Sequence, residues 1–204
     1  MKKTLSLLIL ISFAFLEINA QGTLKTALMS IKSQATYDTL VYFGVDLSQV
    51  RVNDAPKMSK SIEYSQVYPP AWISFIEEKL SPDGFVRHAL GFQTFIYAQR
   101  EIYDKSIRVD PRLIIGYDNN IPTDTIDVVV SNYVLQSKSG LGLVLIPETF
   151  SKPRETAITW AVFFDLKTRH VMYKTKINGK CDHMGYTAHW ATGVVEGFKY
   201  FANH

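Results

Sequence analysis

The strongest structural pattern in the sequence is a strict two-residue alternation over residues 157–165. An extended strand would divide these side chains between its faces, with Ile158, Trp160, Val162 and Phe164 on one and Ala157, Thr159, Ala161 and Phe163 on the other. Residues 165–168 are turn-forming, with Asp165 and Thr168 setting the loop chemistry, and residues 171–177 form a second β-rich run. Two such runs joined by a short polar turn predict a hairpin of antiparallel strands.

Helical and strand periodicities alternate along the rest of the chain. Helices are predicted over 24–35, 69–80, 85–90, 126–133 and 188–202. Strands are predicted over 39–45, 92–98 and 143–146, and Pro147 is expected to end the last of these. Residues 53–66 are polar and irregular. The order predicts the α+β class, as a single domain with a mostly antiparallel sheet of four or five strands and helices packed on one face.

The last predicted helix has the clearest apolar face. Trp190, Val194, Phe198 and Phe201 follow one another at spacings of four, four and three residues. Burying four large apolar side chains at about 2 kcal/mol each is worth on the order of 8 kcal/mol before entropy costs. We therefore expect this helix to pack against the core.

The N-terminus has the three parts of a secretion signal. Lys2 and Lys3 precede an apolar run over 5–16, and a small residue, Ala20, stands before Gln21. A run of this length is too short to span a bilayer, which needs about 20 apolar residues. We expect residues 1–20 to be a cleaved signal peptide, residues 21–204 to form the mature domain, and its location to be periplasmic or secreted.

Composition narrows the possible partners. Cys181 is the only cysteine, so the chain cannot form an internal disulfide and its core must hold the fold. The net charge is +3, and the basic residues are scattered. We therefore expect no nucleic acid and no anionic membrane as partner, and no membrane span after the signal is cleaved.

One loop before the last helix contains residues capable of nucleophilic or metal chemistry. Cys181, His183 and His189 could supply a thiolate with a nearby base, or three ligands to zinc, with Asp182 as a fourth. The spacing matches no established zinc pattern, so a polar loop leading into the helix is the alternative. Cys181, His183 and His189 are the candidate site residues, and no cofactor is predicted.

Other candidate motifs give weaker evidence for a functional site. Gly140 and Gly142 precede a strand rather than open a helix, which favours a turn with positive φ angles over a phosphate loop. Glu77 and Glu78 are adjacent on a helix and point apart, so they cannot act together. The pair Glu148 and Glu155 is expected to be surface charge around a strand connection.

Four strings together resemble a family of uncharacterised exported proteins of Gram-negative bacteria. Residues 42–48 are similar to its Y-G-x-D-x-S strand end, 140–148 to its central glycine-rich strand, 160–171 to its W-x-x-F-F-D hairpin, and 185–191 to its last motif. The chain departs from the family at 180–184, where Cys181 to Met184 replace small residues. More distantly, the hairpin is similar to α/β domains of periplasmic assembly lipoproteins. The resemblance implies an exported location and no assigned activity.

Three functions are therefore considered. The first is a non-enzymatic exported domain that binds a protein or envelope component, as an accessory to surface assembly. The second is a small hydrolase or metal-dependent enzyme that uses Cys181, His183 and His189. The third is carriage of a small apolar ligand between helix and sheet, which needs a cavity.

Overall fold

The computed structural model describes residues 23–53, 67–106, 114–115, 118–182 and 185–204. The predicted signal peptide, most of the irregular segment 53–66 and His183 lie outside these residues. The helices are α1 Leu24–Gln34, α2 Tyr68–Leu80, α3 Arg87–Leu90, α4 Tyr103–Ser106, α5 Thr123–Ser131 and α6 Tyr186–Asn203, with short turns η1 Leu47–Gln49, η4 Pro82–Val86 and η5 Gln99–Glu101. The strands are β1 Thr39–Val45, β2 Arg51–Asn53, β3 Thr94–Tyr97, β4 Ile114–Ile115, β5 Leu141–Ser151, β6 Thr156–Asp165 and β7 Val171–Lys180.

The described strands form one mixed sheet of seven strands. β5, β6 and β7 are antiparallel neighbours, as the hairpin pattern predicts. β1 and β2 lie one after the other along the free side of β5, and both run parallel to it; β3 then flanks β1, and β4 flanks β2, again in parallel. The α+β class is confirmed, but the sheet is larger than expected and mixed. Its parallel pairs join strands through long crossover connections, which local periodicity does not reveal.

The alternation in β6 supplies a core on each face of the sheet. Ala157, Ala161 and Phe163 belong to one cluster, and Trp160, Val162 and Phe164 to the other. In the turn that follows, Asp165 Oδ1 accepts hydrogen bonds from the backbone N–H and the hydroxyl of Thr168, both at 2.7 Å. The predicted hairpin and its loop chemistry are confirmed.

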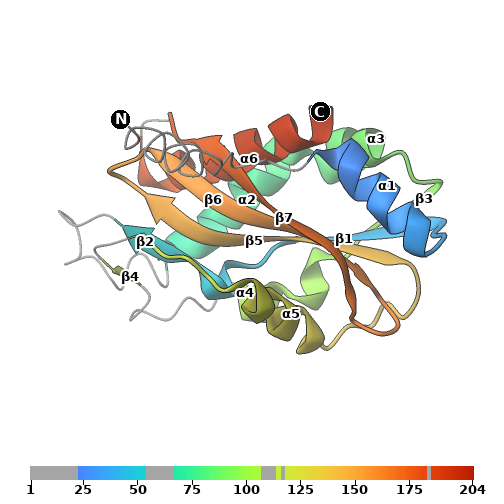
Figure 1. The fold of residues 1–204 in the computed structure, drawn as a ribbon. Helices are drawn as coiled ribbons and strands as arrows, with labels where there is room; N and C mark the ends of the chain where they lie inside the picture. Colours follow the sequence, from blue (N-terminus) through green and yellow to red (C-terminus); the bar gives the residue numbers. More distant parts are fainter. Residues whose placement is uncertain (1–22, 54–66, 107–113, 116–117, 183–184) are drawn as a thin grey trace, which may run out of the picture.

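Helices cover the two faces unequally. Figure 1 shows α1, α2, α3 and α6 on one side of the sheet, where they enclose the larger cluster, and α5 on the other. Ile126 and Val130 of α5 pack into the second cluster with Val41 and Val144. The helices therefore lie mostly on one face, as predicted, with α5 as the exception.

α6 packs closely on β7. Trp190, Val194, Phe198 and Phe201 are all fully buried, which confirms the predicted apolar face. A Cβ at Gly179 of β7 would overlap the backbone of Gly193, one turn before Gly197 on the helix. Because none of these glycines has a side chain, the helix and strand backbones can approach each other.

The prediction that Pro147 ends its strand was wrong. β5 continues to Ser151, and Pro147 lies opposite Thr159 with a register shift immediately after it. On its other side β5 pairs with β1 up to Leu145 and with β2 from Thr149, so Pro147 lies at the gap between those strands. Because no neighbouring strand pairs with β5 at this gap, the missing N–H of the proline breaks no hydrogen bond of the sheet.

Candidate functional site

Cys181, one of the candidate site residues, lies beneath α6. Its side chain is buried, and its sulfur lies against the Cα of Gly193, where an added Cβ would come within 2.5 Å of it. Burial, more than the neighbouring Asp182, raises the pKa of the Cys181 thiol to about 12. A thiol that is buried and protonated at neutral pH is a packing group rather than a nucleophile.

His189 lies in the first turn of α6. The residue is 7% exposed, and its ring packs edge-on against Trp190 with 4.6 Å between the ring centroids. Its Nε2 is 3.5 Å from Lys152 Nζ. His183 lies outside the described residues. Within the part of the chain that the structure describes, no three His, Cys, Asp or Glu side chains gather as metal ligands.

The carboxylate pairs have separate environments. Glu148 is buried, accepting hydrogen bonds from Trp160 Nε1 at 2.7 Å and Lys176 Nζ at 3.0 Å, so it is a structural group within the sheet. The expectation that it is surface charge was wrong, because the bulge after Pro147 directs it inward beside the indole. Glu155 is exposed, as expected.

The two glycines before β5 have different roles. Gly140 has φ +109°, as predicted for a turn. Gly142 has no positive φ; it lies opposite Phe164 in the sheet, and the phenyl ring occupies the space a Cβ would need, at 2.5 Å. The expectation for Gly142 was therefore wrong: the residue makes room for an aromatic ring on the neighbouring strand.

The string that resembles the family's first motif stabilises the end of β1. Asp46 is buried, accepts a hydrogen bond from Tyr133 Oη at 2.6 Å, and caps η1 through the backbone N–H of Ser48 at 2.9 Å. Gly44, two residues earlier, has φ +75° at an irregularity in the pairing with β5. These residues shape the loop where β1 ends.

A group of buried polar atoms near the end of β1 comes from side chains on β1, α2 and η5. Three of their atoms have no hydrogen-bond partner among the described residues: Tyr42 Oη, Glu77 Oε1 and Gln99 Nε2. A Cβ on Gly44 would come within 2.7 Å of Gln99 Cγ and 3.6 Å of Glu77 Oε1, so both side chains pack close to the glycine.

The same group holds the edge strand β3 through Tyr97. The Tyr97 ring stacks on Tyr42 at 5.9 Å, and its hydroxyl hydrogen-bonds to Glu77. Burial raises the pKa of Glu77, and the hydrogen bond from Tyr97 opposes that rise. The sequence predicts the strand and shows that Glu77 and Glu78 point apart, but no pattern in it indicates that Glu77 and Tyr97 meet.

β3 forms one edge of the sheet, and its outer side has no partner among the described residues. Its inner side faces β1: the N–H of Thr94 donates to the carbonyl oxygen of Asp38, just before β1, at 3.1 Å, and the N–H of Ala98 donates to that of Tyr42 at 2.9 Å. Because backbone groups alternate in direction along a strand, those of Phe95 and Tyr97 point outward. Ile96 and Tyr97 are 44% and 37% exposed.

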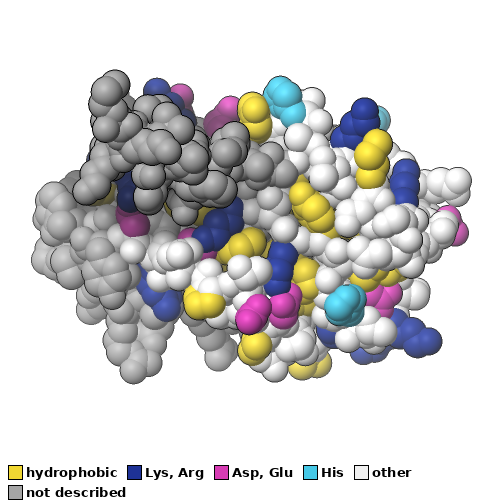
Figure 2. Space-filling model, viewed as in Figure 1, with side chains coloured by type: hydrophobic (Ala, Val, Ile, Leu, Met, Phe, Trp, Pro, Cys, Tyr) yellow, Lys and Arg dark blue, Asp and Glu magenta, His cyan; other side chains and the backbone are white. Residues whose placement is uncertain are grey.

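The visible surface of the described residues carries charges of both signs. Figure 2 shows lysine, arginine and acidic side chains interspersed, with apolar side chains scattered among them. None of the described helices has the length and apolar character needed to cross a membrane.

Comparisons with known proteins assign no family. No family model and no curated protein matches the chain. Among solved structures, the LpoB C-terminal domain from Salmonella enterica overlaps 78% of this chain and 96% of its own, at 10% sequence identity and a TM-score of 0.32. A likeness of that size carries no argument about function.

Proposed function

We propose that this chain is a non-enzymatic exported domain that acts as an envelope accessory protein by adding an extended segment of a partner protein to the open edge of its sheet. The observation that carries this proposal is the outer side of β3, which pairs with no strand among the described residues.

The main chain of β3 supplies the means of binding. Phe95 and Tyr97 each direct one N–H and one C=O away from the sheet, so an incoming strand can form a ladder of main-chain hydrogen bonds with them. Strand addition of this kind takes its affinity from main-chain bonds and its specificity from alternate side chains.

The side chains of β3 leave this edge accessible. Sheet edges are commonly protected from pairing by a charged residue or a proline, and Thr94-Phe95-Ile96-Tyr97 contains neither. Ile96 offers an exposed apolar contact on one face of the added strand, and the ring of Tyr97 offers one on the other.

The polar group behind the strand favours a preorganised edge. Tyr97 is fixed by stacking on Tyr42 and by its bond to Glu77, so the binding strand loses less conformational freedom when a partner arrives. The apolar leader at residues 5–16 and the resemblance to exported proteins support a periplasmic or secreted location for this binding.

The proposal is tested by capturing partners from the native envelope with three forms of the protein. Ile96→Lys places a charge on the edge strand and should abolish capture of the specific partner. Val128→Lys is the matched control, because Val128 is a similarly exposed apolar residue, at 57%, on α5. Melting temperatures close to wild type would show that both variants fold. The proposal would be contradicted if all three forms captured the same proteins, or if none of them captured any protein.

A further inference from the structure

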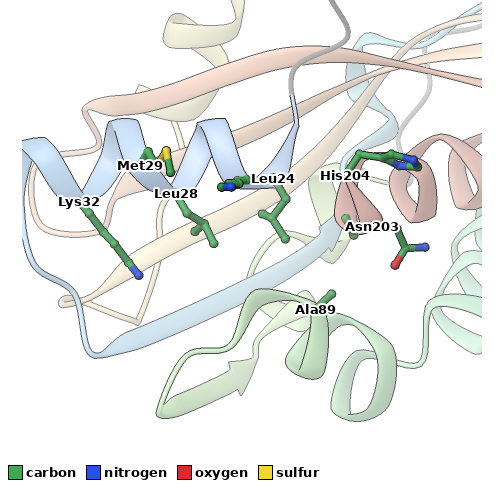
Figure 3. A pocket seen from close by; sticks show the side chains of 9 residues that line it. Leu24, Leu28, Met29, Lys32, Ala89, Asn203 and His204 are labelled. Atoms are coloured by element: carbon green, nitrogen blue, oxygen red, sulfur yellow. The ribbon is translucent and has the colours of Figure 1, made fainter.

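A surface groove lies apart from the β3 edge, between α1, α3 and the C-terminal end of α6 (Figure 3). Its volume is about 380 Å³, within the range of small-molecule sites, which begins at roughly 300 Å³. Its floor is apolar, with Leu24 and Leu28 pointing from α1 toward Ala89 of α3.

The spacing along α1 explains the floor. Leu24 and Leu28 are four residues apart and therefore lie one above the other on one face of the helix. Leu24 is buried beneath the groove, while Met29, beside Leu28, remains 61% exposed at the mouth. The floor is a short apolar strip that could cover a hydrocarbon chain.

Two lysines lie on the rim of the groove. Lys25 and Lys32 lie seven residues apart on α1, roughly 10 Å along the helix, and both line the groove. Among the described residues, no Asp or Glu side chain lines the groove, and none forms an ion pair with either lysine. Asn203 and His204, at the end of α6, complete the polar rim.

We propose that this groove binds a fatty-acid anion, with its hydrocarbon tail on the strip of Leu24, Leu28 and Ala89 and its carboxylate at Lys25 or Lys32. Charge complementarity selects this class of ligand. A neutral apolar molecule would make no use of the two lysines, and a small inorganic anion would make no use of the floor.

The first test is a chain-length series measured by calorimetry. The protein is purified from its native host, in the form that the host accumulates. It is then titrated with octanoate, decanoate and dodecanoate below their critical micelle concentrations. Burial of each additional methylene should strengthen binding about fourfold until the floor is filled. Decanol should bind more weakly than decanoate, because it lacks the carboxylate. One-to-one binding with this dependence supports the proposal; no saturable binding, or equal affinity for decanol and decanoate, overturns it.

Matched variants distinguish the contribution of the ligand's carboxylate from that of its hydrocarbon tail. Replacing the lysine that holds the carboxylate, by Lys25→Gln or by Lys32→Gln, should weaken decanoate binding about two- to fivefold, and neither variant should change decanol binding. The control is Lys167→Gln, which removes an exposed lysine from the hairpin turn outside the groove and should change nothing. Ala89→Leu fills the floor of the groove and should weaken the binding of both decanoate and decanol.

The source of the anion is tested separately. Vesicles of phosphatidylglycerol should not sediment the protein if the site takes free fatty acids. Sedimentation with vesicles in the absence of decanoate binding would replace the proposal with a membrane-surface site. Equal loss of binding in Lys167→Gln and Lys25→Gln would overturn the assignment to this groove. Unchanged melting temperatures exclude misfolding as the cause of any loss.

Discussion

The contact of α6 with β7 gives the sharpest prediction about stability. A Cβ at Gly193 would come within 2.5 Å of Cys181 Sγ, 2.7 Å of Ala157 Cβ and 3.1 Å of the carbonyl oxygen of Gly179. Two of these three atoms are on short side chains and one is backbone, so none of them can move aside cheaply. Gly193→Ala should therefore destabilise the domain.

The magnitude follows from two opposing effects. Overpacking a dense core costs about 1–3 kcal/mol, and contacts this short place Gly193→Ala near the upper end. Replacing glycine by alanine inside a helix stabilises by about 1 kcal/mol. The free energy of unfolding should fall by about 2 kcal/mol, which lowers the melting temperature of a domain this size by roughly 4–8 °C.

Gly197 provides the matched control. A Cβ there would lie 3.1 Å from the backbone nitrogen of Gly179 and 3.3–3.4 Å from the next atoms, which is tight but tolerable. The helix-propensity gain should nearly offset that crowding, so Gly197→Ala should change stability by less than about 1 kcal/mol. Urea and thermal unfolding of both variants measure the difference.

The thiol can be identified as one source of the strain. In a Cys181→Ala background the shortest contact is gone, so Gly193→Ala should cost less there than in wild type, with a coupling above about 0.5 kcal/mol. If Gly193→Ala were as stable as Gly197→Ala, or if the two changes were additive, the close packing of Cys181 under α6 would be refuted.

Three further predictions concern the thiol, the core and Glu77. Because burial raises the pKa of Cys181 to about 12, the thiol should react with a disulfide reagent at neutral pH far more slowly in the folded than in the urea-unfolded protein; equal rates would restore Cys181 as a candidate nucleophile. Trp190→Ala and Phe198→Ala each empty a fully buried position and should cost about 3–5 kcal/mol in urea unfolding, and unchanged melts would contradict the packing of α6. Burial raises the pKa of Glu77 above its ordinary 4.5, so the folded state holds this proton more tightly and stability should decline as pH rises from 4.5 through the raised pKa. Glu77→Gln should remove that decline; an identical pH profile in both proteins would show that Glu77 does not titrate in this way.

The elements predicted correctly from the sequence are those whose pattern is local. The alternation in β6, the apolar spacing of α6 and the start of α1 at Leu24 each depend on residues within one element. The parallel neighbours of β5 depend instead on crossover connections, so they could not be predicted from periodicity. Pro147 shows the same limit, because the strand continues only where β1 and β2 leave a gap beside it.

The candidate site shows a similar division. The sequence identified Cys181 and His189 as reactive residue types, but it did not reveal that Cys181 is buried beneath α6, against Gly193. The spacing of Gly193 and Gly197 on one helical face was a usable indication of close backbone approach. Strand propensity predicted β3, but whether a strand lies at a sheet edge depends on the topology of the whole chain.

The open outer side of β3 is the central claim, and amide hydrogen exchange tests it without a partner. The amides of Phe95 and Tyr97 should exchange quickly because they point away from the sheet, while those of Thr94 and Ala98, bonded to β1, should be protected. Equal protection of all four amides would mean that the edge is already occupied. The strand-addition function would then be contradicted.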